Sequence, residues 1–136
     1  AITQADLILV GPGSLYTSIM PNLLVPGIME ALQASSVQTI YLCNVATEQG
    51  ETDGFTTSDH VRALQHHTFP TIANCVIAND NMTETRVPAN IHMVPPPREE
   101  IPDVRVITAD LIDPEHPLRH NSDRLARAVI DVYHGR

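Results

Sequence analysis

A glycine-rich turn near the start of the sequence, residues 11–18, is the first feature whose residue types could do chemistry. It follows a short apolar run, and its glycines would let the backbone approach an anion closely. Ser14 would cap the following helix, where free N–H groups and the positive end of the helix dipole favour negative charge. Thr17 and Ser18 add hydroxyl donors. The turn lacks the Walker, dinucleotide and nucleophile-elbow patterns, so we expect a phosphate-binding turn of another kind; the plain alternative is a tight turn capped by serine.

Two more polar segments could contribute to a site. Residues 50–54 read Gly-Glu-Thr-Asp-Gly and could hold carboxylates against a nucleobase edge, a sugar hydroxyl or Mg²⁺, or could be an ordinary solvated loop. Arg119 precedes the last predicted helix, where its guanidinium could bind phosphate through two hydrogen bonds; an exposed loop arginine is the alternative. Every residue that could act as a general base is explained equally well by a structural role, so the sequence predicts no catalytic residue.

The seven histidines and two cysteines do not predict a metal site. His66 and His67 are adjacent, so on a helix they point about 100° apart. No His-x-x-x-His pair lies on one helix face, and no Cys-x-x-Cys spacing occurs. Cys43 and Cys75 each lie in an apolar run and are expected to be reduced, buried core residues.

Strands alternate with helices along the chain, which predicts an α/β fold. Short apolar runs bounded by turn residues predict strands at residues 7–10, 39–43, 75–78 and 104–107, with a fifth short strand at 91–94. Helices are predicted at residues 14–20, 28–34, 58–67 and 121–133, the first ended by Pro21 and the third capped by Ser58. With no hairpin signal, the order favours βαβ units in a mostly parallel sheet covered on both faces. The loops at the carboxyl ends of the strands would then meet, as in other open α/β sheets that bind ligands there.

Composition limits the classes of partner. Arg and Lys number 8 and Asp and Glu 16, a net charge of −8, so nucleic acid is not an expected partner, although a small phosphate ligand is. No apolar run approaches the roughly 18 residues of a membrane span, and no signal peptide is recognised, so a cytoplasmic location is expected. The strand at residues 7–10 has no βα unit before it, which suggests that residues 1–136 form the C-terminal half of a longer domain.

Two groups of residues resemble a known family. Residues 11–19, Gly-Pro-Gly-Ser-Leu-Tyr-Thr-Ser-Ile, with 21–25, Pro-Asn-Leu-Leu-Val, form the first group. Residues 50–55, Gly-Glu-Thr-Asp-Gly-Phe, with 58–61, Ser-Asp-His-Val, form the second. Both resemble the gluconeogenesis factor family, which is related to 2-phospho-L-lactate transferase. The resemblance covers the whole chain but only the C-terminal half of the family's single domain, without its N-terminal glycine-rich strand-turn-helix.

The resemblance implies a Rossmann-like three-layer fold that binds a nucleotide sugar of the UDP-N-acetylglucosamine type. The implied cellular role concerns cell shape and wall synthesis during gluconeogenic growth. Carried over residue by residue, the implied ligand-binding set is Gly11, Pro12, Gly13, Ser14, Thr17, Asn44, Thr52 and Arg119. Gly11, Gly13, Ser14 and Thr17 would line the phosphates. Arg119 with His120 and Asn121 matches a family segment near the diphosphate, where Asn121 replaces the commoner Asp.

Two function classes remain open. The first is a regulatory protein that senses a nucleotide sugar and signals to a protein partner; the Leu15-Tyr16-Thr17 and Glu51-Thr52-Asp53 segments match this branch better. The second is a transferase that moves a phospholactyl group from a nucleotide carrier to a deazaflavin, with Mg²⁺ bound to the diphosphate. The absence of a clear general base favours the first. A homodimer is an open expectation for either, and an isolated half-domain that binds nothing by itself is the third alternative.

Overall fold

The computed structural model describes residues 1–136 and contains one parallel sheet of four strands. The strands are β1 (Leu7–Val10), β2 (Gln38–Leu42), β3 (Cys75–Asn79) and β4 (Arg105–Ala109), and they lie in the order β1-β2-β3-β4. All three pairings are parallel. The four predicted strands are therefore confirmed to within two residues at each end. Residues 91–94 do not form the predicted fifth strand, because only Met93 pairs, in an isolated bridge with Ala46.

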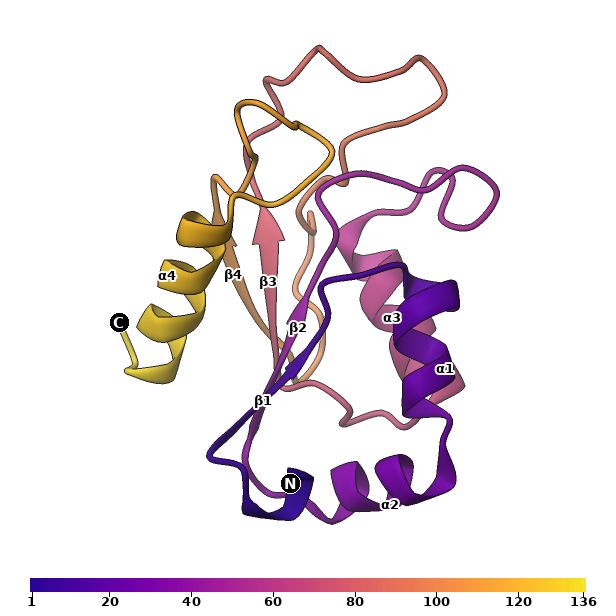
Figure 1. The fold of residues 1–136 in the computed structure, drawn as a ribbon, viewed down its shortest axis with the longest axis vertical. Coiled ribbons are helices and arrows are strands. Elements are labelled where there is room, and N and C mark those ends of the chain that lie inside the picture. Colours follow the sequence, from indigo (N-terminus) through magenta and orange to yellow (C-terminus); the bar gives the residue numbers. More distant parts are fainter.

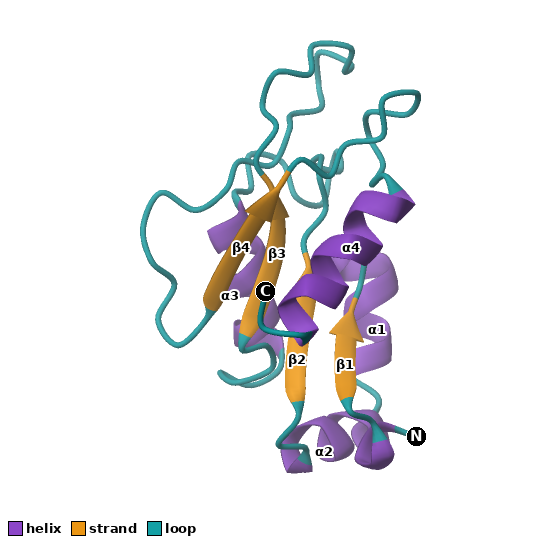
Figure 2. Ribbon diagram, turned by 90° about the vertical axis from the view of Figure 1, so that its left-hand side faces the viewer, coloured by secondary structure: helices purple, strands orange, loops and turns teal.

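Helices cover both faces of this sheet (Figures 1 and 2). Helices α1 (Met20–Leu23) and α3 (Thr57–His67) lie on one face, and α2 (Pro26–Ala34) extends the same layer beyond the amino ends of β1 and β2. Helix α4 (Ser122–Tyr133) lies on the other face. A short 3₁₀ turn, Ile2–Gln4, precedes β1. The three-layer, Rossmann-like α/β architecture predicted from the sequence is confirmed.

Alternating strand residues build two separate cores. One core packs against α1 and α3 and the other against α4, because successive side chains of a strand point to opposite faces. The first core takes Tyr41, Cys43, Val76 and Ala78, and the second takes Ile40, Leu42, Cys75 and Ile77. Both cysteines are free and buried, as predicted, and burial raises the pKa of Cys43 to about 12. That thiol is therefore protonated at neutral pH and is not a reactive nucleophile.

Three local predictions about helix ends are wrong. Pro21 does not end the first helix: a π-type turn, Leu15–Ile19, leads into α1, and Pro21 sits in the first turn of α1, where its missing N–H is not needed. Ser14 makes no capping hydrogen bond. Helix α3 begins at a capping box in which Thr56 accepts from the Asp59 N–H, so Ser58 is not the cap.

None of the helices is both long enough and apolar enough to cross a membrane.

Candidate functional site

Loops from distant parts of the chain enclose a cleft of about 420 Å³ at the carboxyl ends of β1 and β2. Its lining is Gly13, Ser14, Asn44, Val45, Ala46, Thr47, Glu48, Gln49, Ile91, Leu118 and His120. The loops that supply these residues gather beyond the strand tips (Figure 1). A larger hollow of about 640 Å³ lies between Pro97 and Val106, at the amino end of β4. We take the smaller cleft as the candidate site, because open α/β sheets bind ligands at the carboxyl ends of their strands.

Glu48 ties the loop after β1 to the loop after β2. The Ser14 hydroxyl donates to Glu48 Oε2 at 2.6 Å, and Asn44 Nδ2 donates to Glu48 Oε1 at 3.2 Å. Asn44 Nδ2 also donates to the Gly13 carbonyl oxygen at 3.0 Å. Three residues that the sequence analysis selected, Gly13, Ser14 and Asn44, thus converge around a carboxylate that it did not select.

A tight turn holds Glu48 in place. The Glu48 N–H donates to Thr52 Oγ1 at 2.8 Å, and the Thr52 N–H donates back to the Glu48 carbonyl oxygen at 2.9 Å. Thr52 is buried beneath this turn, so it supports Glu48 and does not face the cleft. Asp53 accepts from the Gly50 N–H at 2.6 Å and likewise supports the loop. The expectation that residues 50–54 aim carboxylates at a ligand therefore shifts to Glu48, four residues after Asn44.

His120 forms part of the cleft wall with a neutral ring. Its Nε2 lies 2.9 Å from the Cys43 carbonyl oxygen, so Nε2 carries the proton and donates, which leaves Nδ1 as an acceptor. Burial lowers the pKa of His120, against the smaller opposing effect of that hydrogen bond. The imidazole is therefore uncharged near neutral pH. Asn121, next in sequence, caps α4 by accepting from the Arg124 N–H at 3.0 Å.

The remaining predicted residues lie outside the cleft lining. Gly11 and Pro12 border an apolar groove beside β1. Gly11 has φ +94°, and a Cβ there would lie 3.0 Å from the Leu42 carbonyl oxygen, so this position requires glycine. Thr17 is exposed on the turn before α1. Arg119 is exposed between the cleft residues Leu118 and His120, and its guanidinium makes no hydrogen bond or ion pair within the chain.

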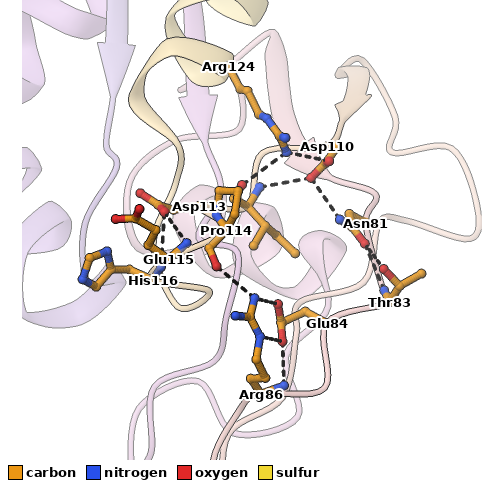
Figure 3. Close-up of polar contacts among 11 residues, drawn as sticks. Asn81, Thr83, Glu84, Arg86, Asp110, Asp113, Pro114, Glu115, His116 and Arg124 are labelled. Carbon is orange, nitrogen blue, oxygen red and sulfur yellow. Dashed lines mark hydrogen bonds and ion pairs between the residues drawn. The ribbon is translucent and has the colours of Figure 1, made fainter.

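Polar contacts brace the loop after β4 (Figure 3). Leu118, Arg119 and His120 belong to the same loop. Arg124 Nη1 lies 2.5 Å from Asp110 Oδ2, and Asn81 Nδ2 donates to Asp110 Oδ1 at 3.1 Å. Burial opposes ionisation of Asp110, but these contacts hold its pKa below the usual value. Arg86 pairs with Glu84 at 2.7 Å and donates to the Pro114 carbonyl oxygen at 2.9 Å. The loops after β3 and β4 are therefore joined to each other and to α4.

Charge in the cleft is negative. Glu48 is the one acidic side chain in the lining, which contains no Arg or Lys. No group of three or more His, Cys, Asp and Glu side chains converges so as to hold a metal ion. A magnesium ion held mainly by the diphosphate of a ligand stays a prediction, because Mg²⁺ commonly needs only one or two protein carboxylates when it binds substrate phosphates.

Together, the three layers and the parallel sheet define a Rossmann-like α/β domain, and the cleft at its carboxyl edge is its candidate ligand site. Residues 1–112 match the family model described as 2-phospho-L-lactate transferase CofD. The chain therefore belongs to the CofD family.

Curated relatives in the family carry the name gluconeogenesis factor. The relative from Halalkalibacterium halodurans is 37% identical in sequence and that from Bacillus subtilis 34%, each over an alignment that covers 96% of this chain. The chain spans 43% and 44% of their lengths, so it corresponds to less than half of each. Two solved structures of a UPF0052-family protein from Bacillus halodurans superpose with TM-scores of 0.82 and 0.86 at 34% and 36% identity. They cover 95% of this chain, which spans 44% of theirs.

Proposed function

We propose that this protein is a regulatory binding protein whose ligand is a nucleotide sugar of the UDP-N-acetylglucosamine type. The observation that carries the proposal is the convergence of Gly13, Ser14, Asn44 and His120, from three separate loops, on one cleft at the carboxyl edge of the sheet. A volume of about 420 Å³ lies in the range of small-molecule sites. The exposed Arg119 beside this cleft supplies a cation for the diphosphate.

The cellular part of the proposal is an influence on cell shape and wall synthesis during growth on gluconeogenic carbon sources. Relatives named gluconeogenesis factor, at 34–37% identity, support the gluconeogenic part of this proposal. The proposal includes a cytoplasmic location and transmission of the binding signal to a protein partner, either directly or through a homodimer. In the cytoplasm both free cysteines would stay reduced.

Calorimetric titration of the full-length protein tests the ligand class. The panel is UDP-N-acetylglucosamine, UDP-glucose, UDP, GDP and ADP-ribose, each with and without Mg²⁺. We expect saturable binding of UDP-N-acetylglucosamine. UDP and GDP, which lack a sugar attached to the diphosphate, should bind more weakly. Failure of every UDP-sugar to bind a folded, monodisperse sample would overturn the proposal.

A transferase is the second candidate, and one specific observation favours it: residues 1–112 match the 2-phospho-L-lactate transferase CofD model. Such an enzyme would transfer a phospholactyl group from a nucleotide-linked diphosphate to a hydroxyl of a deazaflavin, so that the P–O bond of the diphosphate breaks and the nucleoside monophosphate leaves. Incubating the full-length protein with a lactyl-phosphate nucleotide, a deazaflavin and Mg²⁺ distinguishes the candidates. Formation of the phospholactyl product would favour the transferase, and saturable sugar-nucleotide binding without turnover would favour the regulator.

A further inference from the structure

The cleft contains side-chain acceptors that can take further hydrogen bonds. Each Glu48 oxygen accepts one internal hydrogen bond, from Ser14 or from Asn44, and a carboxylate oxygen can accept about two. His120 Nδ1 is a second acceptor, because Nε2 is already bonded to the Cys43 carbonyl oxygen. A ligand group that donates hydrogen bonds therefore finds partners in this cleft.

Two side-chain donors of the cleft are already occupied. The Ser14 hydroxyl proton points to Glu48, and the Asn44 amide donates to Glu48 and to the Gly13 carbonyl oxygen. A phosphate brought against these groups would have to displace a carboxylate from its donors and would meet the negative charge of that carboxylate. With no cation in the lining, the electrostatics disfavour a diphosphate at this spot.

Two aliphatic side chains give the cleft an apolar wall. Ile91 and Leu118 line the cleft, and Leu118 is 41% exposed although it is a large hydrophobic residue. They come from loops after β3 and β4 that Arg86 joins through its hydrogen bond to the Pro114 carbonyl oxygen (Figure 3). An acceptor-rich floor beside an aliphatic wall suits a ring that has hydroxyl groups at its edge and C–H groups on its face.

We infer that this cleft is the sugar subsite, in which Glu48 accepts hydrogen bonds from ligand hydroxyls while Leu118 packs on the face of the sugar ring. The inference rests on the proposed function and divides the ligand in two. The sugar occupies the cleft lined by Ser14, Asn44 and Glu48, and the diphosphate binds outside that lining, toward the exposed Arg119.

The test compares UDP-N-acetylglucosamine with UDP, which lacks the sugar, by calorimetric titration of the full-length protein. Glu48→Ala should weaken UDP-N-acetylglucosamine about tenfold or more, because a hydrogen bond to a charged group is lost, and should leave the affinity for UDP unchanged. Glu48→Gln keeps one acceptor oxygen and should stay within about threefold of wild type. Glu115→Gln, an exposed charge change on the neighbouring loop, is the matched control and should alter neither affinity.

Leu118→Ser provides a second variant whose folding is not at risk, because the side chain is already partly exposed. It should also weaken the sugar nucleotide selectively. Equal losses for UDP and UDP-N-acetylglucosamine in Glu48→Ala and Leu118→Ser, or no loss in either, would overturn the inference while leaving nucleotide-sugar binding intact. If wild type binds neither probe, the proposed function itself fails.

Discussion

At the scale of single residues, a carboxylate defines the site more than the expected phosphate ligands do. Ser14 and Asn44 reach the cleft, but both donate to Glu48, which lies 34 residues from Ser14 and four from Asn44. The sequence shows that residues 44–54 form a polar loop after a strand. It does not show which acidic side chain of that loop turns inward, because a contact over 34 residues depends on how two loops pack.

Arg119 carries the residue-scale prediction. Its guanidinium is exposed and makes no hydrogen bond or ion pair in the chain, although its charge attracts the nearby Asp113 carboxylate, so it can turn to the diphosphate of a ligand. Arg119→Ala should cost about 1.5–3 kcal/mol of binding free energy, typical of a hydrogen bond to a charged group, with little change in thermal stability. Arg119→Lys should recover only part of the loss, since lysine keeps the charge but not the planar fork. Titration of both variants with UDP decides; wild-type affinity in Arg119→Ala would remove this residue from the site.

At the scale of elements, the strands were predictable, but among the helix starts only that of α4, capped by Asn121, was predicted correctly by its cap. Four apolar runs that stop near glycine, asparagine or aspartate form the four strands. The central strands β2 and β3 are buried on both faces, which leaves little choice of residue, whereas the edge strands β1 and β4 are partly exposed. Helix starts depend on which of several hydroxyl or amide side chains meets a free N–H. Thr56 rather than Ser58 caps α3, and the Ser14 hydroxyl donates to Glu48 instead of capping a helix. Pro21 lies in the first turn of α1, because first-turn positions tolerate proline.

Helix α3 gives a prediction about pH. His60 is fully buried in its first turns: Nδ1 lies 2.8 Å from the Thr56 carbonyl oxygen, and Nε2 has no partner. Burial lowers the pKa of His60 below 6.5, outweighing that hydrogen bond and the nearby Asp59 and Glu48 charges. The unfolded chain then binds the proton more readily, so stability should be full above about pH 6.5 and fall as the pH drops below it.

Urea unfolding of wild type and His60→Asn at pH 7 and pH 5 measures this effect. The variant cannot titrate at this position and should lose less stability between the two pH values than wild type does. His120 has a pKa shifted in the same direction, so some pH dependence should remain in the variant. An identical loss in both proteins would show that His60 is not part of the pH response.

At the scale of the whole molecule, the sheet ends at an incompletely covered strand. β1 pairs only with β2, Leu9 is 45% exposed, and an apolar groove runs beside it between Ile2 and Leu32. This chain spans 43% and 44% of the lengths of two curated relatives. That residues 1–136 form the C-terminal half of one domain stays a prediction.

The open edge of β1 predicts that the isolated chain associates with itself. Open strands with unpaired N–H and C=O groups invite pairing with another chain, so residues 1–136 expressed alone should form oligomers or aggregate. Size-exclusion chromatography with light scattering, at several concentrations, measures this. A monodisperse monomer that unfolds cooperatively would show that the domain is self-sufficient as it stands.

The most direct test of the central claim, that a nucleotide sugar binds at the carboxyl edge of the sheet, is a crystal structure of the full-length protein with UDP-N-acetylglucosamine. We predict the sugar ring in the cleft between Glu48 and Leu118, with the diphosphate outside it and within reach of Arg119. Electron density for the ligand away from the loops after β1 and β2, or a diphosphate bound directly to Ser14 and Asn44 with Glu48 displaced, would contradict this account.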